Sequence, residues 1–597
     1  MPLPEINTTV TTSARLCERK WRFAEEAPPE FLATAQGMPA PLAHLCYQRG
    51  LRTWESVQEF LHPDYATHLH DPWSFRHMER VVDRIWFARE RGEHILVHGD
   101  YDADGVSGAA MLSETLEALG CTTDVFIPHR ERDGYGFTAA ALAYARERDI
   151  RVIVTCDCGI ANAATIATAQ ERGIDVVVTD HHCIPTDATG AAVLPPAYAI
   201  LHPGVPGETY PFPHLTGGGV AFKLCVALVQ RDRASAAPRL PRGFEKWLLD
   251  CVAIATVADL GVLMGENRVL VRYGLTVLEK TRRPGLRALY DLARITPERI
   301  TPTTIGFQIA PRMNAAGRLA HARTAWELLR ATEAPHARVL AEQLETWNTE
   351  RQRLVEDAAR EAIAQVGDRG ARRSVVAVGA EWSPGIVGLV ATRLREQYAC
   401  PAFALTTAGE KIVGSGRSVE GFDIVEALRA ASDTLAAFGG HPQACGFTVK
   451  SAADIAVFTE RVDAYAQLHC TEEQLVPTLR VDLVLEFAAL SWEFAEQLAQ
   501  LGPFGVGHPA PLFCFRAVRI EAVRAMGASG RHARLGMREV RSGMVRSVVV
   551  FSYMDRFPHL VPGMVVDLVA EVEPREWNGQ REVQVRAVDM RVTAEHI

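Results

Sequence analysis

The chain has 597 residues, of which 48% are hydrophobic and 23% charged, a composition typical of soluble globular proteins. This length exceeds what one hydrophobic core can organise, so about three or four domains are expected. The net charge of −9 argues weakly against nucleic acid as a partner. A carboxylate-rich metal site or a locally basic groove is compatible with that charge, so composition leaves the partner open.

No segment predicts a secreted or membrane-spanning protein. The N-terminal MPLPEINTTVTTSARLCERK lacks the apolar region of a signal peptide. The most apolar stretch begins at Leu248 and contains Asp250 and Asp259, which favours a buried core segment. The twelve cysteines show no repeating zinc-type spacing, and packing is the favoured role for Cys156 and Cys158. We therefore expect a cytoplasmic protein with reduced cysteines.

The elements expected in the first half alternate between strands and helices. Residues 1–75 are expected to form an N-terminal helical segment, and residues 76–330 one α/β domain. The expected strands of this domain are 94–99, 122–128, 151–157 and 175–180, and its expected helices are 106–119, 138–148 and 160–173. Strands that are apolar throughout and alternate with helices indicate a parallel sheet covered on both faces.

The second half predicts a connector, a second α/β domain and a barrel. Residues 331–370 have few helix breakers and indicate a long connector helix. Residues 371–470 repeat the α/β pattern, with strands in RSVVAVG, PAFALT and KIVGSGRS. Residues 471–597 combine a linker with short strands typical of an oligonucleotide-binding (OB) fold. The predicted fold class is α/β, with two α/β domains joined by a long helix and followed by an OB-fold β-barrel.

Acidic and imidazole side chains gather where the expected strands or segments of the first α/β domain end. ILVHGDYDADG supplies His98, Asp100, Asp102 and Asp104, VIVTCD supplies Asp157, VVVTDHH supplies Asp180, His181 and His182, and AIATVAD supplies Asp259. A single such aspartate is more often a helix N-cap, and an isolated pair of histidines is unremarkable. Because the carboxyl ends of parallel strands meet at one rim, the whole set would repel itself unless a cation paired it.

Divalent cations resolve this repulsion. A thiolate-free set of imidazoles and carboxylates suits Mn²⁺ or Mg²⁺. Two such ions would clamp the attacking and leaving oxygens of a phosphoryl group and lower the pKa of an attacking water. Gly99 and Gly105 are expected to allow tight turns, and the helix from Val106 to direct its N-terminal amides at an anion. The pattern therefore predicts a metal-dependent phosphoesterase.

These residues resemble the DHH phosphoesterase family, whose Asp-His-His signature stands at residues 180–182. The resemblance extends to the RecJ-type single-strand-specific exonucleases, which carry the block HGDYDADG. Further blocks follow in order: RERDGYGFT, LTGGGVAFKL, ADLGVLMGENRVLVRYGL, PRMNAAGRL, GSGRS, FGGHPQACGF and PFGVGHPAPLF. The resemblance covers residues 45 to 595 and implies a DHH domain, its C-terminal associated domain and an OB barrel.

The resemblance also implies roles for single residues. One metal ion would be held by His98, Asp102 and Asp157, and the second by Asp104, Asp157, His181 and Asp259, with Asp157 bridging. Catalytic roles are implied for Asp180, which would orient a ligand, for His182, which would meet the scissile phosphate, and for Asp100 and His441. His441 belongs to the associated domain, which is expected to close over the substrate.

Other residues are expected to bind the substrate. A terminal 5′ phosphate would lie against Arg130, Ser415 and Arg417, because a guanidinium binds phosphate bidentately. A channel for single-stranded DNA would be lined by Arg312, Asn314 and Arg318. For these arginines, an ordinary interdomain ion pair is the alternative. In the barrel, the candidates are Phe513, Phe515 and Arg534, with a core role as the alternative for the two aromatics.

The chain departs from the family pattern at Ser383, where relatives usually carry histidine, and at His202, where asparagine is common. Neither position belongs to the expected metal set. The replacement at Ser383 puts in doubt any nucleotide contact that the usual histidine makes.

The implied function is a metal-dependent 5′-to-3′ exonuclease that degrades single-stranded DNA to mononucleotides in mismatch, base-excision and recombinational repair. The chain is expected to act as a monomer, with a single-strand-binding protein and a RecQ-type helicase as partners. Two alternatives stay open. A small-substrate DHH phosphodiesterase usually lacks a terminal barrel, and a metal-poor DNA-binding scaffold typically loses part of the ligand set.

Overall fold

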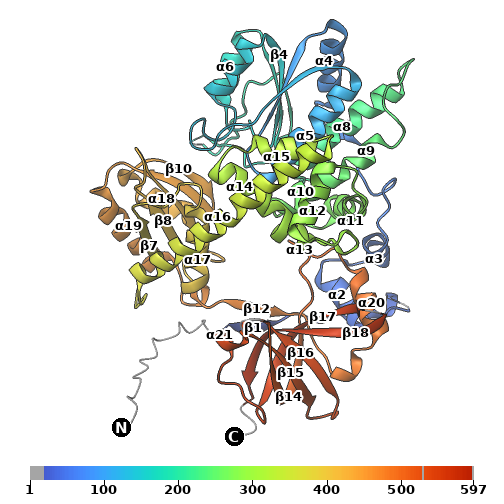
Figure 1. The fold of residues 1–597 in the computed structure, drawn as a ribbon, viewed down its shortest axis with the longest axis vertical. Helices are drawn as coiled ribbons and strands as arrows, with labels where there is room; N and C mark the ends of the chain where they lie inside the picture. The colour runs from blue at the N-terminus through green and yellow to red at the C-terminus, as the bar shows by residue number, and fades with distance from the viewer. Residues whose placement is uncertain (1–18, 36, 188, 528–529, 578, 594–597) are drawn as a thin grey trace.

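The computed structural model describes residues 19–593 except 36, 188, 528–529 and 578. Figure 1 shows two α/β domains, at the top and at the left, and a β-barrel at the bottom. A long helix, α16 (Ala334–Val366), connects the two α/β domains. This arrangement confirms the predicted fold class. The first 18 residues, on which the expectation about a signal region depends, lie outside the described residues.

The first α/β domain is built on a five-stranded parallel sheet with the order β3-β2-β4-β5-β6. Its strands are β2 (His94–Gly99), β3 (Thr122–Phe126), β4 (Ile150–Cys156), β5 (Asp175–Thr179) and β6 (Ala199–Leu201). The strands β2, β4 and β5 are almost entirely buried, as their apolar sequences predict. Because all five strands are parallel, their carboxyl ends lie along one edge of the sheet.

Helices cover both faces of this sheet. On one face, α5 (Ala103–Leu119), α8 (Gly217–Arg233) and α10 (Leu249–Ala258) pack against one another and share an apolar core with β2 and β4. On the other face, α6 (Ala139–Glu147) and α7 (Ala163–Glu171) close a second apolar cluster. Along β2, Ile95 and Val97 belong to the first cluster and Leu96 to the second, as the two-residue period of a strand requires.

The second α/β domain contains a mixed sheet with the order β10-β11-β9-β8-β7. Its strands are β7 (Val375–Gly379), β8 (Ala402–Thr406), β9 (Ile412–Arg417), β10 (Leu435–His441) and β11 (Ala444–Val449). Only β7 and β8 pair in parallel, whereas β9, β10 and β11 join in antiparallel ladders. The glycine-rich FGGHPQACGF, expected as a turn, is therefore a hairpin. Helix α17 (Val387–Tyr398) packs between this sheet and α16.

The C-terminal domain is a closed barrel. Its long strands are β14 (Phe513–Met526), β15 (His532–Glu539), β16 (Val545–Val550), β17 (Val565–Trp577) and β18 (Gln580–Val592). The pairing of β14 with both β15 and β17 closes the cylinder. Phe513 and Phe515 are fully buried in its core. The expectation that these two rings stack on DNA bases is therefore wrong, and the core alternative holds.

The N-terminal segment packs on the barrel. Strand β1 (Lys20–Phe23) pairs in parallel with β12 (Thr478–Val481), which precedes the barrel. Helices α2 (Ala40–Gln48) and α3 (Trp54–Leu61) bury their apolar side chains in the same cluster as the barrel strands. The segment before the first α/β domain thus completes the core of the last domain.

A buried arginine ties the first α/β domain to the barrel linker. Arg268, on α11 (Gly265–Glu279), donates from Nε to the carbonyl of Phe60 at 2.9 Å and from a terminal nitrogen to the carbonyl of Gly502 at 2.7 Å. Its guanidinium also stacks on the Phe60 ring, 3.6 Å from the centroid. Burial lowers the pKa of Arg268 to about 9. This contact joins the N-terminal segment, the first α/β domain and the residues that lead into the barrel.

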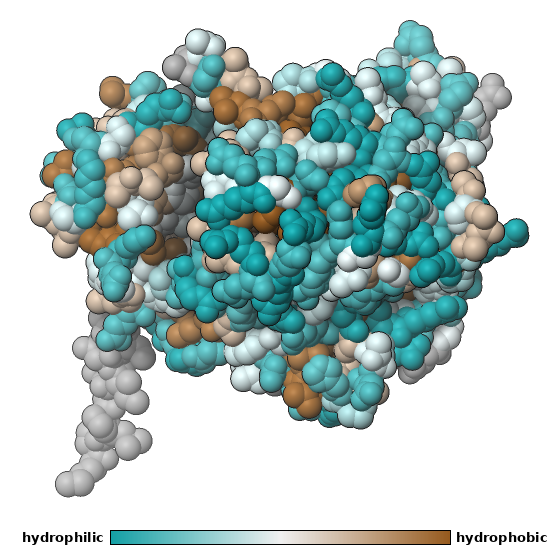
Figure 2. Space-filling view, turned by 90° about the horizontal axis from the view of Figure 1, so that it is seen from above, coloured by the Kyte–Doolittle hydropathy of each residue, from teal (hydrophilic) through white to brown (hydrophobic). Residues whose placement is uncertain are grey.

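Among the described residues, no helix combines the length and the apolar character needed to cross a bilayer. The face seen in Figure 2 is mostly hydrophilic and carries separate, small apolar patches.

Candidate metal and phosphate site

Three loops and one helix end bring the predicted carboxylates and imidazoles together. Asp104 begins α5 after β2, Asp157 follows β4, and His181 follows β5. Asp259 comes from the C-terminal end of the buried helix α10. The Nε2 atom of His181 lies 3.1 Å from Asp157, 3.4 Å from Asp259 and 3.8 Å from Asp104, measured to carboxylate oxygens. These four residues are the set expected for one metal ion.

A second group contains Asp100, Asp102 and Asp157, whose oxygens lie within 4.8 Å of one another. The Nε2 atom of His98, which is expected in this group, is buried and has no hydrogen-bond partner among the described residues. Its ring is buried between Phe126 and Phe137, and burial lowers its pKa to about 4. The structure adds Asp100, expected in a catalytic role, to the candidate ligands of this group, and the role of His98 stays a prediction.

Several polar atoms at this edge are buried and have no hydrogen-bond partner. They are His98 Nε2, Asp100 Oδ1, Asp157 Oδ1 and His181 Nε2. His181 and Asp157 are close, but they are not aligned for a hydrogen bond. Buried polar atoms are rarely left unpaired, because each one costs about 1–3 kcal/mol. Unpaired carboxylate and imidazole atoms gathered at one edge of a sheet fit divalent cations.

The protonation equilibria agree with this interpretation. Burial, followed by the charge of Asp102, raises the pKa of Asp104 to about 7. Burial, followed by the charge of Asp104, raises the pKa of Asp259 to about 8. Burial also raises the pKa of Asp100 and of Asp157 well above the usual range. The pKa values of four neighbouring carboxyl groups are thus raised together, which indicates that too little positive charge lies nearby to balance them.

Asp180 organises the Asp-His-His turn. One of its oxygens accepts hydrogen bonds from the backbone amides of His181 and His182, at 2.7 and 3.1 Å, and the other accepts from the amide of Ile160. The same carboxylate lies 2.8 Å from Nδ1 of His182. Burial alone would lower the pKa of His182, but this contact outweighs it and raises the pKa to about 9. His182 is therefore a cation beside the carboxylate cluster near neutral pH.

Two further residues hold His182 in place, and the sequence analysis assigned neither of them a role. The hydroxyl of Tyr135 lies 3.1 Å from Nε2 of His182. His202 is buried and donates from Nε2 to the carbonyl of His182 at 2.8 Å, because its Nδ1 accepts from the amide of Gly204. His202, where asparagine is common, therefore provides a hydrogen-bond donor to the Asp-His-His turn. In the sequence, only its place in the RERDGYGFT block could have pointed to a role for Tyr135.

Glycines let the backbone approach the carboxylates closely. The amides of Gly217 and Gly218, at the start of α8, donate to Asp104 at 2.8 and 2.7 Å. A Cβ atom on Gly217 would collide with the side chain of Asp157, and one on Gly105 would collide with Asp100. Gly105 has no left-handed backbone angle, so close approach explains this glycine better than the tight turn expected from sequence. The sequence alone gives no reason for the glycines of the LTGGGVAFKL block, whereas this packing shows that they allow close approach to the carboxylates.

Helix α5 begins earlier than expected. Asp102 is its N-cap and accepts hydrogen bonds from the amides of Asp104 and Gly105.

Asp157 has a φ of 64°, a left-handed conformation that is uncommon for aspartate. Such strain in a non-glycine residue clusters at functional sites, where the surrounding structure enforces it.

A group of arginines lies next to the carboxylates, between the two α/β domains. Arg318, on α14 (Ala310–Leu319), donates to the carbonyl of Gly385 at 2.9 Å. Burial, followed by the charges of Arg130, Arg351 and Arg417, lowers the pKa of Arg318 to about 9. Within the described part of the chain, no carboxylate lies at ion-pair distance from Arg130, Arg318 or Arg417. This group therefore lacks negative charge, as the neighbouring carboxylates lack positive charge.

The remaining predicted substrate residues divide into two classes. Ser415 and Arg417 lie on β9, and the guanidinium of Arg417 donates to Ser415 Oγ at 2.8 Å. Arg312 forms an ion pair with Glu345 on α16, at 2.5 Å. Asn314 accepts from the amide of Ala103 at 2.7 Å and supports the start of α5. The expected lining of a channel by Arg312 and Asn314 stays a prediction.

The second α/β domain also contributes to the surroundings of the site. His441 is exposed at the end of β10. Burial lowers the pKa of His181 to about 4, and the charge of His441 contributes a small further lowering. Ser383 accepts from the amide of Gly385 in the turn before α17. The serine thus shapes the loop whose carbonyl receives Arg318.

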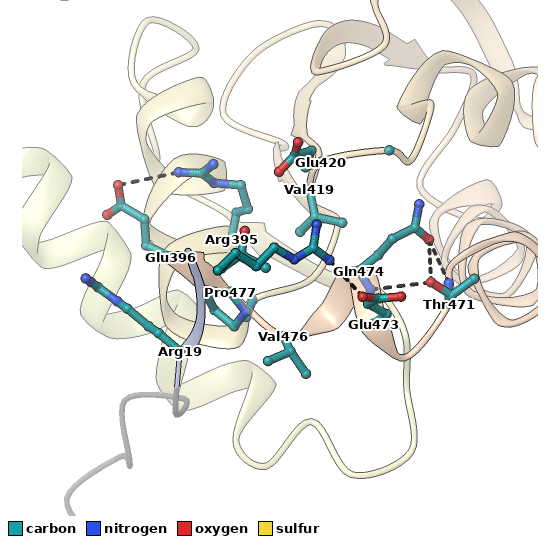
Figure 3. A pocket seen from close by; sticks show the side chains of 14 residues that line it. Arg19, Arg395, Glu396, Val419, Glu420, Thr471, Glu473, Gln474, Val476 and Pro477 are labelled. Carbon is teal, nitrogen blue, oxygen red and sulfur yellow. Dashed lines mark hydrogen bonds and ion pairs between the residues drawn. The ribbon is translucent and has the colours of Figure 1, made fainter. Parts of the chain in front are cut away.

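A separate cavity of about 790 Å³ lies between α17, the loop after β9 and the linker around residue 475 (Figure 3). Its lining contains three arginines and three glutamates, of which Arg22 contacts Glu473 at 2.7 Å and Arg395 contacts Glu396 at 3.7 Å. Because these charges are neutralised locally, the cavity is a weaker candidate for a phosphate site than the arginines near Arg318.

Three domain families match consecutive parts of the chain. The N-terminal domain of the DHH family matches residues 94–256, the DHHA1 domain matches residues 372–468, and the RecJ OB domain matches residues 481–589. These ranges fall on the first α/β domain, the second α/β domain and the barrel.

Relatives and a solved structure extend over nearly the whole chain. The single-stranded-DNA-specific exonuclease RecJ of Bacillus subtilis is 37% identical over 555 residues, covering 92% of this chain and 68% of the relative. The RecJ of Escherichia coli is 31% identical over 570 residues, covering 92% and 95%. The crystal structure of RecJ from Thermus thermophilus in complex with Mn²⁺ matches with a TM-score of 0.80 and 30% identity, covering 96% of this chain and 80% of that one. Sequence, domain order and fold agree, and the chain belongs to the RecJ family of single-stranded-DNA-specific exonucleases.

Proposed function

We propose that this protein hydrolyses single-stranded DNA from the 5′ end to mononucleotides, with two divalent metal ions, Mn²⁺ or Mg²⁺, at the carboxyl edge of the first sheet. The observation that carries the proposal is the pairing of two unbalanced clusters. One contains buried carboxylates whose pKa values are raised by burial and by one another, and the other contains arginines that have no carboxylate at ion-pair distance among the described residues. Asp102 acts electrostatically on Arg318, so the two clusters are neighbours. A phosphodiester with bound metal ions would supply cations to the carboxylates and an anion to the arginines.

The chain holds the ions through two groups of residues. One ion would be bound by Asp104, Asp157, His181 and Asp259, and the other by Asp100, Asp102 and Asp157. Divalent ions in such a site neutralise the phosphate and increase the acidity of the attacking water. His182, held as a cation by Asp180, is placed to donate a hydrogen bond or a proton to a phosphate or leaving oxygen.

The arginines supply a means of binding a phosphate at the end of a strand. The guanidinium of Arg130 stacks on the ring of Tyr101, 4.1 Å from the ring centroid, and the guanidinium of Arg417 donates to Ser415 Oγ. A terminal phosphate carries more charge than an internal one, and guanidinium groups with no carboxylate partner favour it. We therefore assign the 5′-phosphate pocket to Arg130, Arg318, Ser415 and Arg417. The assigned end is 5′ because of the resemblance to the family, and labelled substrates test it.

The deciding experiment uses single-stranded oligonucleotides labelled at the 5′ or the 3′ end, incubated with Mn²⁺, with blunt duplex DNA and RNA as controls. The proposal expects immediate release of label from the 5′-labelled strand and progressive shortening of the 3′-labelled strand. Prompt loss of the 3′ label would contradict the polarity. Roles in repair and recombination, partnership with a single-strand-binding protein and a RecQ-type helicase, and action as a monomer stay predictions.

Metal binding should stabilise the protein more at high pH. The folded-state pKa values of Asp104, about 7, and Asp259, about 8, lie above the ordinary value of 3.8. The metal-free fold therefore binds more protons than the unfolded chain in this window, and its free energy of unfolding falls as the pH rises through it. Metal ions require the ionised carboxylates, so the increase in melting temperature on adding Mn²⁺ should be larger near pH 8 than near pH 6. An equal increase at both pH values would contradict the assignment.

The barrel should bind the strand through a basic groove. A cavity of about 530 Å³ is lined by Arg534, Arg575 and Arg581, and Arg581 also lines a neighbouring cavity beside Trp492. Replacing the three arginines by alanine should weaken binding of long single strands and reduce the slope of log affinity against log salt by about 2. Fluorescence anisotropy at several salt concentrations measures both quantities.

The matched control is Arg541→Ala, an exposed barrel arginine that pairs with Glu486 at 3.0 Å. Its affinity and salt slope should equal those of the unmodified protein. If the triple variant also keeps both values, the barrel has another purpose, such as binding a protein partner.

A further inference from the structure

The carboxylates of Asp104 and Asp259, two candidate ligands of the same ion, are held in different ways. That of Asp104 accepts hydrogen bonds from the amides of Gly217 and Gly218, at 2.8 and 2.7 Å. In the described part of the chain, no donor makes a hydrogen bond to the carboxylate of Asp259, which lies 3.4 Å from Nε2 of His181. The position of the Asp259 carboxylate therefore depends on the backbone that carries it.

The backbone between α10 and α11 forms a short loop, residues 259–264, which we call the Asp259 loop. Within it, Leu260 has a φ of 57°, so a branched side chain is held in the left-handed region at a cost of about 1–2 kcal/mol. Such strain persists only where the surrounding structure enforces it. On one side, a Cβ on Gly261 would collide with Thr216 and Thr256, so this end of the loop packs tightly on α10 and on the start of α8.

The other end of the loop contacts the segment that leads into the barrel, residues 501–508, which we call the linker turn. The amide of Leu263 donates to the carbonyl of Val506 in this turn at 2.8 Å. The turn is fixed in its own place, because Arg268 donates to the carbonyl of Gly502 at 2.7 Å. The Asp259 loop is thus held between the first α/β domain and the linker turn.

Glycines let the loop and the turn approach each other closely. A Cβ on Gly505 would lie 2.6 Å from Cδ1 of Leu263, and one on Gly507 would lie 2.6 Å from Cγ1 of Val262. Leu263 is buried, so its side chain has little room to move aside. A larger side chain at position 505 must therefore displace the Asp259 loop.

We propose that the linker turn is a positioning element of the metal site. It holds the Asp259 loop from the side of the barrel and thereby increases the affinity for the ion bound by Asp104, Asp157, His181 and Asp259. This inference rests on the proposed function and adds a role for a segment outside the candidate ligands. Groups that orient a ligand typically change metal affinity 10- to 100-fold when they are altered.

The test measures binding of Mn²⁺ in the absence of DNA, by isothermal titration calorimetry. We expect Gly505→Ala to weaken one of two binding events about tenfold or more and to leave the other unchanged. Asp259→Asn should weaken the same event. Adding Gly505→Ala to Asp259→Asn should have no further effect, because the turn acts through Asp259.

The control for a general loss of stability is Leu535→Ala. Leu535 is fully buried in the barrel core, so this variant should unfold at a lower temperature. Its dissociation constants for Mn²⁺ should equal those of the unmodified protein. A merely structural role of the linker turn would give Gly505→Ala the same behaviour as this control.

Hydrogen exchange of the unmodified protein gives a second measurement that needs no variant. If the docked turn favours Mn²⁺ binding, Mn²⁺ must by linkage stabilise the docked turn. The amides of Gly505 and His508 donate to each other's carbonyls at 2.9 and 3.1 Å. Their exchange should slow when Mn²⁺ is added, and this measurement decides if Gly505→Ala does not fold.

Three outcomes would overturn the inference. Gly505→Ala could bind both ions as the unmodified protein does, it could weaken binding equally in the Asp259→Asn background, or Mn²⁺ could leave the exchange of the linker turn unchanged. If the unmodified protein binds no Mn²⁺ at all, the proposed function fails instead.

Discussion

Replacing Asp157 by alanine is expected to abolish cleavage of single-stranded DNA, with a loss of at least ~10³-fold under saturating Mn²⁺. Asp157 belongs to both groups of candidate ligands and lies 3.1 Å from Nε2 of His181. Its removal therefore takes one ligand from each ion. Affinity for single strands should stay within a few-fold, because the arginines and the barrel groove are unchanged. Release of labelled nucleotide and fluorescence anisotropy measure the two effects separately.

Asp149→Ala is a matched control for backbone strain. Asp149 precedes β4, as Asp157 follows it, and it also has a left-handed φ, of 51°. Its side chain is exposed and pairs only with Arg151. This variant bears the same conformational cost without removing a ligand, so it should cleave normally.

Asp157→Asn gives an independent check. Burial raises the pKa of Asp157, so its ionised form destabilises the metal-free fold. The asparagine variant should lose activity and yet unfold at a higher temperature than the unmodified protein in the presence of a chelator near pH 8. A variant that is both active with Mn²⁺ and unchanged in stability would refute the two-ion arrangement.

The position of most site residues could be predicted because parallel strands end at one edge. The apolar runs at β2, β4 and β5 identify three strand ends, and the carboxylates that follow them must meet. Asp259 was correctly grouped with them, but its helix could not be recognised. Helix α10 is buried on all sides, so its sequence has no polar face to reveal a helical period.

Contacts between distant segments left no local signal in the sequence. The parallel pairing of β1 with β12 and the contact of Arg268 with Gly502 join parts of the chain that are far apart in sequence. The same limit explains the error at Phe513 and why the ion pair of Arg312 could not be predicted. The sequence does not distinguish an arginine that contacts DNA from one that pairs with Glu345. It also does not distinguish a barrel phenylalanine that faces the core from one that faces solvent.

Replacing Arg417 by alanine is expected to remove most of the preference for a 5′-phosphorylated end over a 5′-hydroxyl end. Burial lowers the pKa of Arg417, and its guanidinium rests on Ser415 Oγ and on the carbonyl of Gly416, both at 2.8 Å. A Cβ on Gly388 would lie 2.8 Å from this guanidinium, so the glycine leaves room for it. Loss of one charge-assisted contact to a phosphate should lower kcat/KM for 5′-phosphorylated strands about 10- to 100-fold.

The alternative, in which Arg417 serves only to hold the two domains together, is tested with one further variant and two controls. Arg417→Lys keeps the charge but loses the bidentate geometry, so a phosphate contact predicts an intermediate preference. Arg429→Ala, an exposed arginine of the same domain that pairs with Glu426, should keep the full preference. Mn²⁺ should raise the melting temperature of Arg417→Ala as it does for the unmodified protein, because none of the candidate ligands is changed. If Arg417→Ala instead loses activity equally on 5′-phosphorylated and 5′-hydroxyl strands, the residue does not read the terminal phosphate, and the origin of polarity lies elsewhere in the site.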